Sequence, residues 1–543
     1  MKIQFLGASK VVTGSNYLIT TDKHKILLDC GLYQGSDSLE KLNYEDFNFN
    51  PEEIDFLFLS HAHIDHSGRI PLLVKKGFKG KVVTTKATKD LCDIMLVDSG
   101  HIQESDVKWE NKKRKRAGKP LIKPLYTAKD AEISLNYFDT VLYDQKIDIN
   151  EEISIRFKDA GHILGSSIIE LWIKERNDEV KIVFSGDIGM KNKPILRDPT
   201  FIEDADYLIM ESTYGNRLHE NIKERTKKLT DIINETVMRE GTVIIPSFAV
   251  GRTQELIYEL NKYYENNETL EEFMKIPIYI DSPMAVSATD AFKENTYCFD
   301  EEAKKMILEG DNPFEFENLH YVRDHKESMR LNNYTFPKVI ISASGMCTAG
   351  RIKHHLKHNL WKGRNSVVFV GYQAEGTLGR ILKDGAKKVK VLGEDVVVEA
   401  KVHSIEGYSG HADQSDLLNW LKGFKKLPKR IFIVHGEEES ANTFANLISK
   451  NFNVKTIVPD LGYTFEIKED ELKSYDKDYL KPIKRKEDIK KELQEVYEQF
   501  ENLVSNTNKL MDDEFLKEDY DRVKNKLLEL QQDLMDITIL LGK

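Results

Sequence analysis

Cysteine is scarce in this sequence, and a net positive charge and long apolar runs are absent from it. Four cysteines occur among 543 residues, at Cys30, Cys92, Cys298 and Cys347, too scattered for a Cys-x-x-Cys metal knuckle or a secreted disulfide scaffold. No apolar run is long enough to cross a membrane, and residues 1–7 lack the features of a signal peptide. We therefore expect reduced thiols, a cytoplasmic location and no membrane contact.

An overall basic charge for nucleic acid is also missing, because the net charge of the chain is −11. Charged residues make up 31% and hydrophobic residues 40% of the sequence, as in ordinary globular proteins, and the length allows about three domains. A basic footprint, if present, must be local. The run from Lys112 to Lys119 is such a footprint. This run could bind phosphates by charge neutralisation, or it could be a solvated loop, and the sequence supports both roles equally.

Three histidines and an aspartate lie within six residues: His61, His63, Asp65 and His66. The apolar run 54–59 before them predicts a buried strand, and the pattern after them predicts a helix, so the four side chains lie at a strand-to-helix turn. Imidazole and carboxylate are the ligands that zinc takes in open catalytic sites. Packing does not explain so dense a cluster, which therefore predicts a metal site.

Three further residues, His162, Asp187 and His435, each follow a strand-like apolar run. Together with the first cluster they fit a two-metal site, in which two ions clamp the attacking and leaving oxygens of a phosphoryl displacement. Zinc suits this mixture of ligands, and manganese also accepts it. Asp29, at the end of another strand, is expected to orient one of the ligands. The prediction gives His61, His63 and His162 to one ion, Asp65, His66 and His435 to the other, and Asp187 to both.

The pattern of apolar runs changes along the chain. Up to about residue 210, short strands end in polar residues, as in layered α/β folds that place chemistry at strand ends. Longer helices then alternate with apolar strands, which predicts βαβ units on a parallel sheet, before the earlier pattern returns. Two amphipathic helices close the chain; they pack on it, or form a homodimer or protein-partner contact. The predicted parts are residues 1–210, 211–400, 401–478 and 479–543.

Several motifs, taken in order, resemble those of a known family. The segments 61–66, 161–162 and 185–187 resemble the metallo-β-lactamase superfamily. The resemblance covers Met1 to about Ile467 and is strongest toward compact bacterial β-CASP ribonucleases and the endonuclease subunit of the eukaryotic pre-mRNA 3′-end cleavage factor. The three motifs of that β-CASP branch of nucleases are matched by Glu211–Gly215, Tyr408–Asp413 and Val434–Glu438.

The resemblance implies an α/β fold with three components. An αββα metallo-β-lactamase sandwich would be built from residues 1–210 and 401–478. A parallel-sheet β-CASP domain would be inserted at 211–400, and a C-terminal helical hairpin at 479–543 would extend beyond the part that compact bacterial members cover.

The resemblance also implies a dinuclear zinc-dependent ribonuclease. It would hydrolyse phosphodiester bonds of single-stranded RNA endonucleolytically and leave 5′-phosphate and 3′-hydroxyl ends. The family assigns His411 as the general acid and Glu211 as its positioning partner; we count Asp65 among the catalytic residues as well. Histidine at position 435 is typical of RNA-processing members. A 5′-exoribonuclease, a thioesterase or lactamase, and a non-catalytic RNA-binding scaffold are the alternatives.

Turns after the strands of the middle part are candidates for substrate contacts. Small residues there let backbone N–H groups approach a phosphate, and nearby arginine or tyrosine side chains hold a phosphate or stack a base. His354 and His355 are adjacent on a predicted helix, cannot both face one metal, and are assigned to the surface or a hinge. The candidate contacts are Ser247, Arg252, Ser344, Gly345, Arg351, Tyr372 and Arg380.

Overall fold

The computed structural model describes residues 1–473 with gaps at 177, 220–224, 266–275, 372, 374–375, 406 and 469, and a few positions after residue 495. It divides into one compact unit, Met1–Ser474, and a second unit, Tyr475–Lys543. No helix among the described residues has the length and apolar character that crossing a membrane requires. All four cysteines are free and buried.

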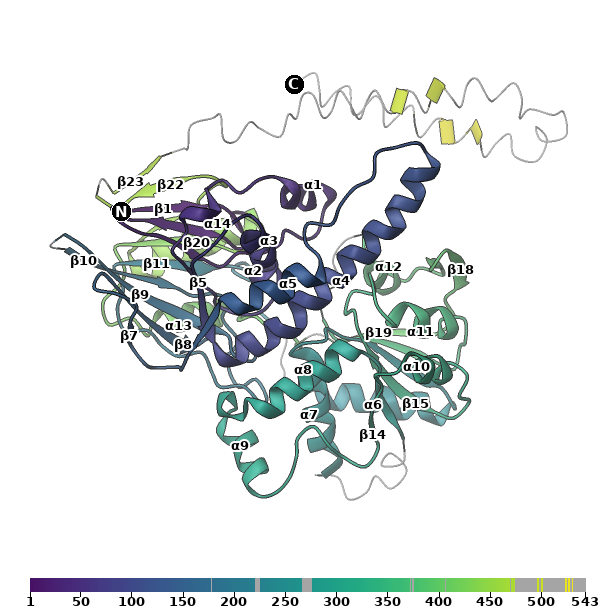
Figure 1. Cartoon of the computed structure of the whole chain (residues 1–543). Coiled ribbons are helices and arrows are strands. Elements are labelled where there is room, and N and C mark those ends of the chain that lie inside the picture. The colour runs from purple at the N-terminus through teal and green to yellow at the C-terminus, as the bar shows by residue number, and fades with distance from the viewer. Residues whose placement is uncertain are drawn as a thin grey trace. The chain divides into compact units, whose positions relative to one another are not determined.

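Two large sheets form the first part of the compact unit (Figure 1). The first sheet has eight strands, in the order β23 (Glu471–Lys473), β22 (Thr464–Glu466), β1 (Lys2–Phe5), β2 (Tyr17–Thr20), β3 (Lys25–Leu28), β4 (Phe56–Phe58), β5 (Lys81–Thr85) and β6 (Phe138–Val141). The second has seven, in the order β21 (Lys455–Ile457), β20 (Arg430–Val434), β11 (Tyr207–Glu211), β10 (Asp178–Phe184), β9 (Ser167–Glu175), β8 (Ile153–Asp159) and β7 (Ile147–Asp148).

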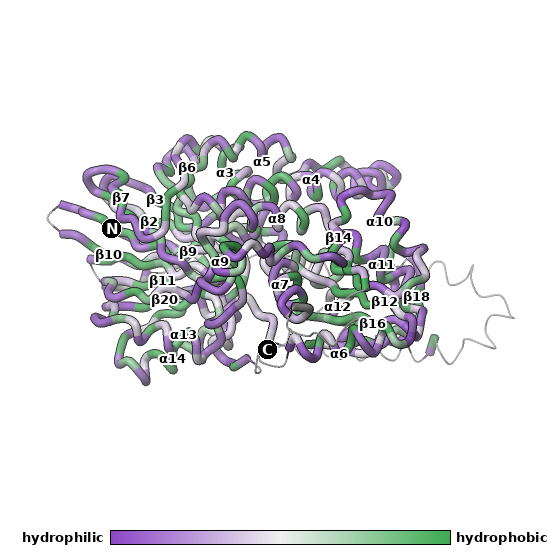
Figure 2. The backbone as a smooth tube through the Cα atoms, turned by 90° about the horizontal axis from the view of Figure 1, so that it is seen from below, coloured by the Kyte–Doolittle hydropathy of each residue, from purple (hydrophilic) through white to green (hydrophobic). Residues whose placement is uncertain are grey.

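The two sheets pack face to face through one aromatic-rich cluster. Phe5 and Tyr17 of the first sheet contact Phe432 and Phe184 of the second, with ring centroids 5.0 Å and 5.4 Å apart. Helices cover the outer faces, and Figure 2 shows hydrophobic colour along inner strands such as β11 and β20. The αββα sandwich is therefore confirmed. The covering helices are α3 (Ile70–Lys75), α4 (Lys86–Arg116) and α5 (Ala128–Ser134) on the first sheet, and α13 (Gln414–Leu421) and α14 (Glu438–Phe452) on the second.

A third sheet of six strands, all paired in parallel, lies in the chain between β11 and β20. This confirms the predicted parallel sheet. Its last strand lies past residue 400, so the inserted sheet extends a few residues beyond the boundary expected there. The strand order is β14 (Leu319–Tyr321), β13 (Ile278–Ile280), β15 (Lys338–Ser342), β12 (Thr242–Pro246), β16 (Ser366–Phe369) and β19 (Lys401–Ser404).

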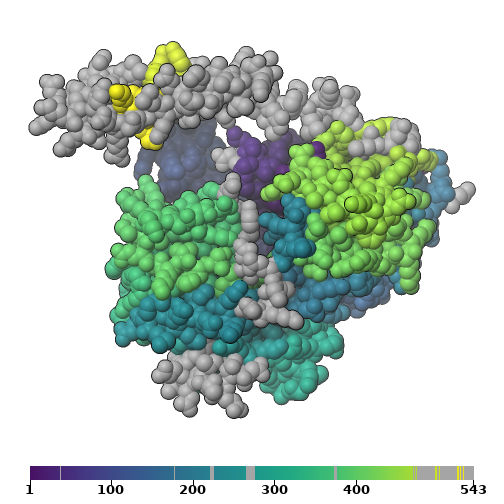
Figure 3. All heavy atoms as spheres, turned by 180° about the vertical axis from the view of Figure 1, so that it is seen from behind, coloured from purple at the N-terminus to yellow at the C-terminus, as the bar shows by residue number. Residues whose placement is uncertain are grey.

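Helices surround the inserted sheet, and two of them join it to the sandwich. Leu91 of α4 belongs to the same buried cluster as Leu256 and Phe292 of the inserted part, so one core spans both parts. Seen from behind in Figure 3, the green inserted part and the yellow-green α13 and α14 region lie on opposite sides. The helices are α6 (Arg225–Met238), α7 (Arg252–Glu265), α8 (Pro283–Glu294), α9 (Glu301–Leu308), α10 (His325–Leu331), α11 (Ile352–Asn359) and α12 (Leu378–Lys383).

The basic run 112–116 is helical rather than a loop, and most of its side chains are exposed to solvent. It forms the end of α4, a 31-residue helix that starts where the Thr85 side chain accepts a hydrogen bond from the Thr88 N–H. Gly100 does not break the helix; a Cβ there would lie 2.6 Å from the backbone nitrogen of Ala128 in α5. The helix ends at Arg116, with Ala117 as its C-cap, and Gly118 follows with a φ of +64°.

The predicted C-terminal hairpin lies mostly outside the described residues. The described positions of the second unit are helical, which agrees with the predicted secondary structure, and nothing described there tests a partner or dimer contact. These positions are Val496, Tyr497, Phe500, Glu501, Val523, Lys524, Lys526, Leu527 and Leu530.

Candidate metal centre and active site

The site lies at the carboxyl ends of neighbouring strands. Strands β10, β11 and β20 run parallel, so the residues that end or follow them meet at one edge of the second sheet. Asp187 follows β10, Glu211 is the last residue of β11, and His435 follows β20. The turn after β4 supplies His61 and His63 from the facing sheet, and the short helix α2 (Ile64–Ser67) supplies Asp65 and His66.

Three imidazoles of the first predicted set converge. His63 Nδ1 lies 3.1 Å from His61 Nε2 and 3.1 Å from His162 Nε2. Ligand atoms of His61, His63, His162 and Asp187 all lie within 4.8 Å of one another. Nitrogens that face one another across so short a distance are arranged as they are around a zinc ion.

The second predicted set converges in the same way. His66 Nε2 lies 3.1 Å from His435 Nε2, and Asp65 Oδ2 lies 3.5 Å from the latter nitrogen. The other nitrogen of His66 donates to Asp29 Oδ2 at 2.6 Å. Asp29 in turn accepts hydrogen bonds from Ser15 and Ser60. Its fully buried carboxylate thus fixes the His66 ring, as expected of a residue that orients a ligand.

Asp187 lies between the two sets. Its Oδ2 is 3.5 Å from His61 Nε2 and 3.3 Å from His66 Nε2, and its Oδ1 is 3.6 Å from His435 Nδ1. Oδ1 is buried and has no hydrogen-bond partner. A buried carboxylate oxygen without a partner is costly unless a cation fills that role, so the residues present fit a bound metal.

Burial and the neighbouring charges decide which imidazoles are neutral. Burial lowers the pKa of His63 to about 4 and holds the pKa of His61 and His162 well below the usual value. Neutral imidazole is the form that binds metal. Burial alone would lower the pKa of His66 as well, but the carboxylates of Asp187 and Asp29 outweigh it and raise that pKa. Three of the predicted ligands are therefore ready for a cation at neutral pH.

His411 lies beside the metal cluster and faces Glu211. Its Nδ1 is 3.2 Å from Glu211 Oε2, and its ring centroid is 4.5 Å from that of His162. Burial opposes the charged form, but Glu211 and Asp187 outweigh it and raise the pKa of His411 to about 9. Glu211 itself is fixed by the Ile188 N–H, which donates to it. The raised pKa favours the charged form of His411, and Glu211 lies against its Nδ1 rather than its Nε2.

A small cavity of about 140 Å³ borders the loop that carries His411. It contains polar groups that the sequence analysis gave no role: Tyr214, Arg217 and His219. The guanidinium of Arg217 lies 4.5 Å from the centre of the Tyr214 ring, and His219 Nε2 donates to the His411 carbonyl at 3.0 Å. In the sequence, these three residues are marked only by their position shortly after Glu211: Tyr214 lies within the first β-CASP motif, and Arg217 and His219 follow it.

Most of the candidate substrate contacts already have partners within the chain. Arg351 pairs with Asp281 at 2.6 Å, Arg380 pairs with Asp384 at 2.8 Å, and Arg252 pairs with Glu255, so each guanidinium already has a carboxylate partner. Ser247 is buried, whereas Ser344 Oγ accepts from the Thr348 and Ala349 N–H groups. Gly345 packs against Phe248, because a Cβ added at this glycine would lie 2.9 Å from the Phe248 ring. Tyr372 lies outside the described residues.

The assignment of His355 to the surface or a hinge is wrong. His354 is exposed, but His355 is fully buried and its Nε2 lies 2.6 Å from Asp281 Oδ2. Adjacent helix positions differ by about 100° in direction, so one ring faces the solvent and the other faces the core. Asp281 also binds Ser328 and Arg351. This network holds α10 and α11 against β13.

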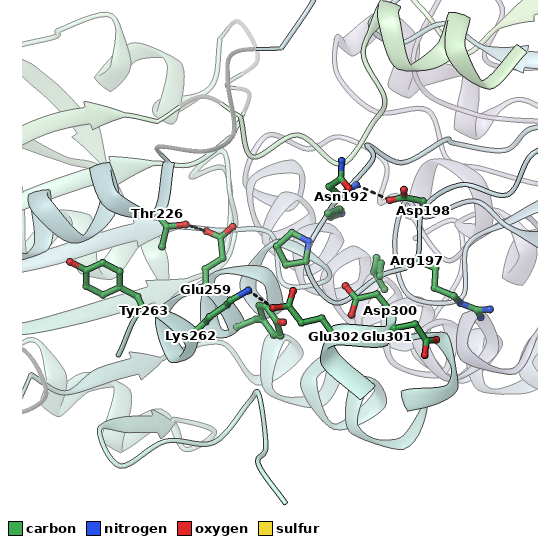
Figure 4. A pocket seen from close by; sticks show the side chains of 14 residues that line it. Asn192, Arg197, Asp198, Thr226, Glu259, Lys262, Tyr263, Asp300, Glu301 and Glu302 are labelled. Carbon is green, nitrogen blue, oxygen red and sulfur yellow. Dashed lines mark hydrogen bonds and ion pairs between the residues drawn. The ribbon is translucent and has the colours of Figure 1, made fainter. Parts of the chain in front are cut away.

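A second cavity, of about 720 Å³, lies outside the candidate metal centre (Figure 4). None of the seven candidate ligands lines it. Carboxylates outnumber cations around it, and Lys262 pairs with Glu302, so it is a poor surface for a phosphate backbone. Its charged lining residues are Lys193, Arg197, Asp198, Glu259, Lys262, Asp300, Glu301 and Glu302.

Family models match three segments of the chain. The metallo-beta-lactamase superfamily matches residues 10–141. The Beta-Casp domain matches residues 253–382, and the Zn-dependent metallo-hydrolase RNA specificity domain matches residues 395–459. These segments follow one another in the order that the motifs predict.

Whole-chain relatives agree with the family models. The chain is 37% identical over 449 residues to ribonuclease TTHA0252 of Thermus thermophilus, an alignment that covers 83% of this chain and 96% of that protein. It is 32% identical to the transcription termination factor FttA of Methanocaldococcus jannaschii, covering 84% and 70%. It is 31% identical to an RNase J-like protein of the same archaeon, covering 85% and 98%. The chain therefore belongs to the β-CASP family of the metallo-β-lactamase superfamily and is a metal-dependent hydrolase.

Proposed function

We propose that the chain is a dinuclear zinc-dependent ribonuclease that cuts single-stranded RNA internally and leaves 5′-phosphate and 3′-hydroxyl ends. The observation that carries this proposal is the convergence of seven candidate metal ligands beside His411, whose pKa is raised to about 9. His61, His63 and His162 would hold one ion. Asp65, His66 and His435 would hold the other, and Asp187 would contact both.

The two ions, when bound, would supply Lewis acidity and an activated water for attack on phosphorus. The residues of the chain do the rest. Asp29 keeps His66 in one orientation through a 2.6 Å contact, and Glu211 keeps His411 in another. As the bond between phosphorus and the 3′-oxygen breaks, the Nε2–H of His411 donates its proton to that oxygen. Hydrolysis thus consumes one water and returns a 3′-hydroxyl and a 5′-phosphate.

RNA is favoured over other substrates by three observations. The RNA specificity model matches residues 395–459, and two of the relatives are named as RNases. Histidine stands at position 435, as in RNA-processing members of the family. Tyr214 and Arg217 line the small cavity beside His411 and offer a ring face and a cation, which suit an unpaired base and its phosphate.

The domain division is part of the proposal. Residues 1–210 and the segment from about residue 405 to 478 would form the hydrolase sandwich around an inserted β-CASP domain. The pairing of β11 with β20, which are about two hundred residues apart, supports this division. Because β19 ends at Ser404 within the inserted sheet, we place the second boundary after that residue rather than at 400.

Circular and 5′-labelled linear RNA test the mode of cleavage. A circle has no end, so only an endonuclease opens it, and end-mapping of the linear substrate identifies the groups left at the cut. We expect the metal-loaded protein to open the circle and to leave 5′-phosphates. Cleavage of linear RNA alone would show a 5′-exonuclease, and binding without cleavage of either would contradict hydrolysis. Asp187→Ala is the matched control, since it removes the proposed shared ligand, and its Tm shows whether the fold is kept.

A further inference from the structure

A buried group of charges links the inserted domain to the loop that carries His411. Arg225, the first residue of α6, is 3% exposed and binds two carboxylates of α7, Glu255 and Glu259. Its other terminal nitrogen donates to the Gly407 carbonyl at 2.5 Å. The Tyr408 hydroxyl donates to Glu259 at 2.8 Å, and the Arg225 guanidinium lies 4.4 Å from the centre of the Tyr408 ring.

Both ends of this loop are anchored. On the sandwich side, the Ala412 N–H donates to the Ile188 carbonyl at 2.7 Å, and His162 donates to the Gly410 carbonyl at 3.0 Å. On the side of the inserted domain, the described anchors are the Arg225 and Glu259 contacts to Gly407 and Tyr408. His411 stands three residues after Tyr408, and its two neighbours, Gly410 and Ala412, are the residues anchored on the sandwich side. Its position relative to the metal cluster therefore depends on both domains.

Chemistry gives a reason for this arrangement. A general acid must reach the leaving oxygen within hydrogen-bond distance at the moment the bond breaks, and small misplacements cost large factors in rate. Buried ion pairs contribute little net stability, because the loss of hydration offsets the attraction, but their geometry is exacting. Arg225 forms a planar fork that fixes two carboxylates and a carbonyl at once.

We infer that Arg225, Glu259 and Tyr408 are positioning residues for the proton transfer: the inserted domain uses them to set His411 against the leaving 3′-oxygen of RNA. This rests on the proposed function and deepens it. Glu259 also accepts a hydrogen bond from Thr226 at 2.9 Å, which Figure 4 shows at the edge of the larger cavity. The described hydrogen bonds of the Arg225, Glu259 and Tyr408 side chains include none to the seven predicted metal ligands, so we expect substitutions of these side chains to leave the metals in place.

Activity measured on two phosphate diesters distinguishes a positioning role of these three residues from a merely structural one. RNA needs a proton on its leaving oxygen, whereas bis(p-nitrophenyl) phosphate releases a stable phenolate that needs none. We expect Tyr408→Phe to lower kcat on RNA about tenfold, the size of one hydrogen bond to a charged group, with KM unchanged. Activity on the activated diester should stay within about twofold, since no proton transfer is involved. Metal content and Tm should match those of the wild type.

Matched variants complete the design. Glu259→Gln should act in the same direction as Tyr408→Phe. Tyr321→Phe removes the hydroxyl of a half-buried tyrosine that donates to the Phe314 carbonyl, and Glu302→Gln removes an exposed partner of Lys262. Neither variant should change the activity on either diester. Equal losses on both diesters in Tyr408→Phe and Glu259→Gln, or no loss on RNA in either, would overturn the inference.

The behaviour of His411→Ala separates this inference from the proposed function. It should lose RNA cleavage and keep the activated diester. If it keeps RNA cleavage, the proposed acid is wrong and the positioning role falls with it. If His411→Ala loses RNA cleavage as expected, but Tyr408→Phe and Glu259→Gln do not show the expected loss on RNA, the positioning role alone is wrong and the proposed function stands.

Discussion

Buried imidazoles a few ångströms apart carry different charges in this site because their partners differ. His63 has nitrogens for neighbours, and burial lowers its pKa to about 4. His411 faces the carboxylates of Glu211 and Asp187, and its pKa rises to about 9. One residue type thus serves as a neutral ligand and as a proton donor in the same cluster. The surroundings of each ring, rather than its depth, assign the role.

The first prediction concerns His411 itself. His411→Ala should lower the rate of RNA cleavage by a factor of about 10² to 10⁴, the usual contribution of general acid catalysis, while it keeps the metal content of the wild type. Rates on a labelled oligonucleotide and elemental analysis of the same sample check both parts. A variant that loses its metal would show that His411 acts as a ligand instead.

A second prediction follows from the pKa of His411. The protonated ring is the active form, so cleavage should fall as pH rises through about 9. Glu211→Gln removes the carboxylate that raises this pKa, so the fall should begin at lower pH. A pH profile of kcat/KM measures the shift. Glu203→Gln, which removes an exposed carboxylate paired with Lys425, should leave the profile unchanged. An unshifted profile in Glu211→Gln would contradict the assigned partnership.

Residue types at strand ends were enough to predict seven side chains that the fold brings together. They do not show which arginines contact a substrate. An arginine after a strand has the same local sequence whether it holds a phosphate or an internal carboxylate, and Arg351 has Asp281 as its partner. That partner is seventy residues away and becomes visible only in the folded chain. The networks around Arg225 and His355 were missed for the same reason.

At the scale of elements, the parallel arrangement of β10, β11 and β20 brings the chemistry together. Apolar runs and turn residues predicted the strands, because their period and boundaries are local properties. The length of α4 was not predicted, because its basic end carries no apolar stripe to mark a helix. In the structure, Gly100 lies where α4 packs closely against the start of α5.

A third prediction tests that approach. Alanine is favoured over glycine in helices by about 1 kcal/mol, so Gly100→Ala would stabilise a free helix. Here a Cβ would lie 2.6 Å from the Ala128 nitrogen and 2.8 Å from the Thr127 carbonyl carbon, which are backbone atoms. The clash should outweigh the propensity and lower the free energy of unfolding by about 1–3 kcal/mol.

Thermal unfolding of the full chain measures the effect. Ser105→Ala, at an exposed position of the same helix, is the control and should leave Tm unchanged or raise it slightly. A rise in Tm for Gly100→Ala would mean that α4 and α5 are not in contact at this point.

At the scale of the whole molecule, segments far apart in the sequence complete each sheet. Strand β1 pairs with β22, and β11 pairs with β20, so the inserted part leaves and returns between adjacent strands. The shared core of α4, α7 and α8 then joins the two parts. The fold class could be predicted because the motifs occur in order. The joint core could not, since its contacts link α4 to helices well over a hundred residues away.

A fourth prediction concerns metal removal. The ligands come from both large sheets, so bound metal ties the sheets together and stabilises the folded state by about 4 kcal/mol at a thousandfold excess over Kd. A chelator should therefore lower Tm and abolish cleavage, and zinc should restore both. In Asp187→Ala the chelator should change Tm much less. An unchanged Tm in the chelated wild type would argue against metal binding at this centre.

Metal content per chain is the most direct test of the seven-ligand site. Elemental analysis of the purified protein after zinc reconstitution and removal of excess metal should find two zinc ions per chain, and clearly fewer in Asp187→Ala. A single ion in the wild type, or an unchanged content in Asp187→Ala, would contradict a two-metal centre built around that carboxylate.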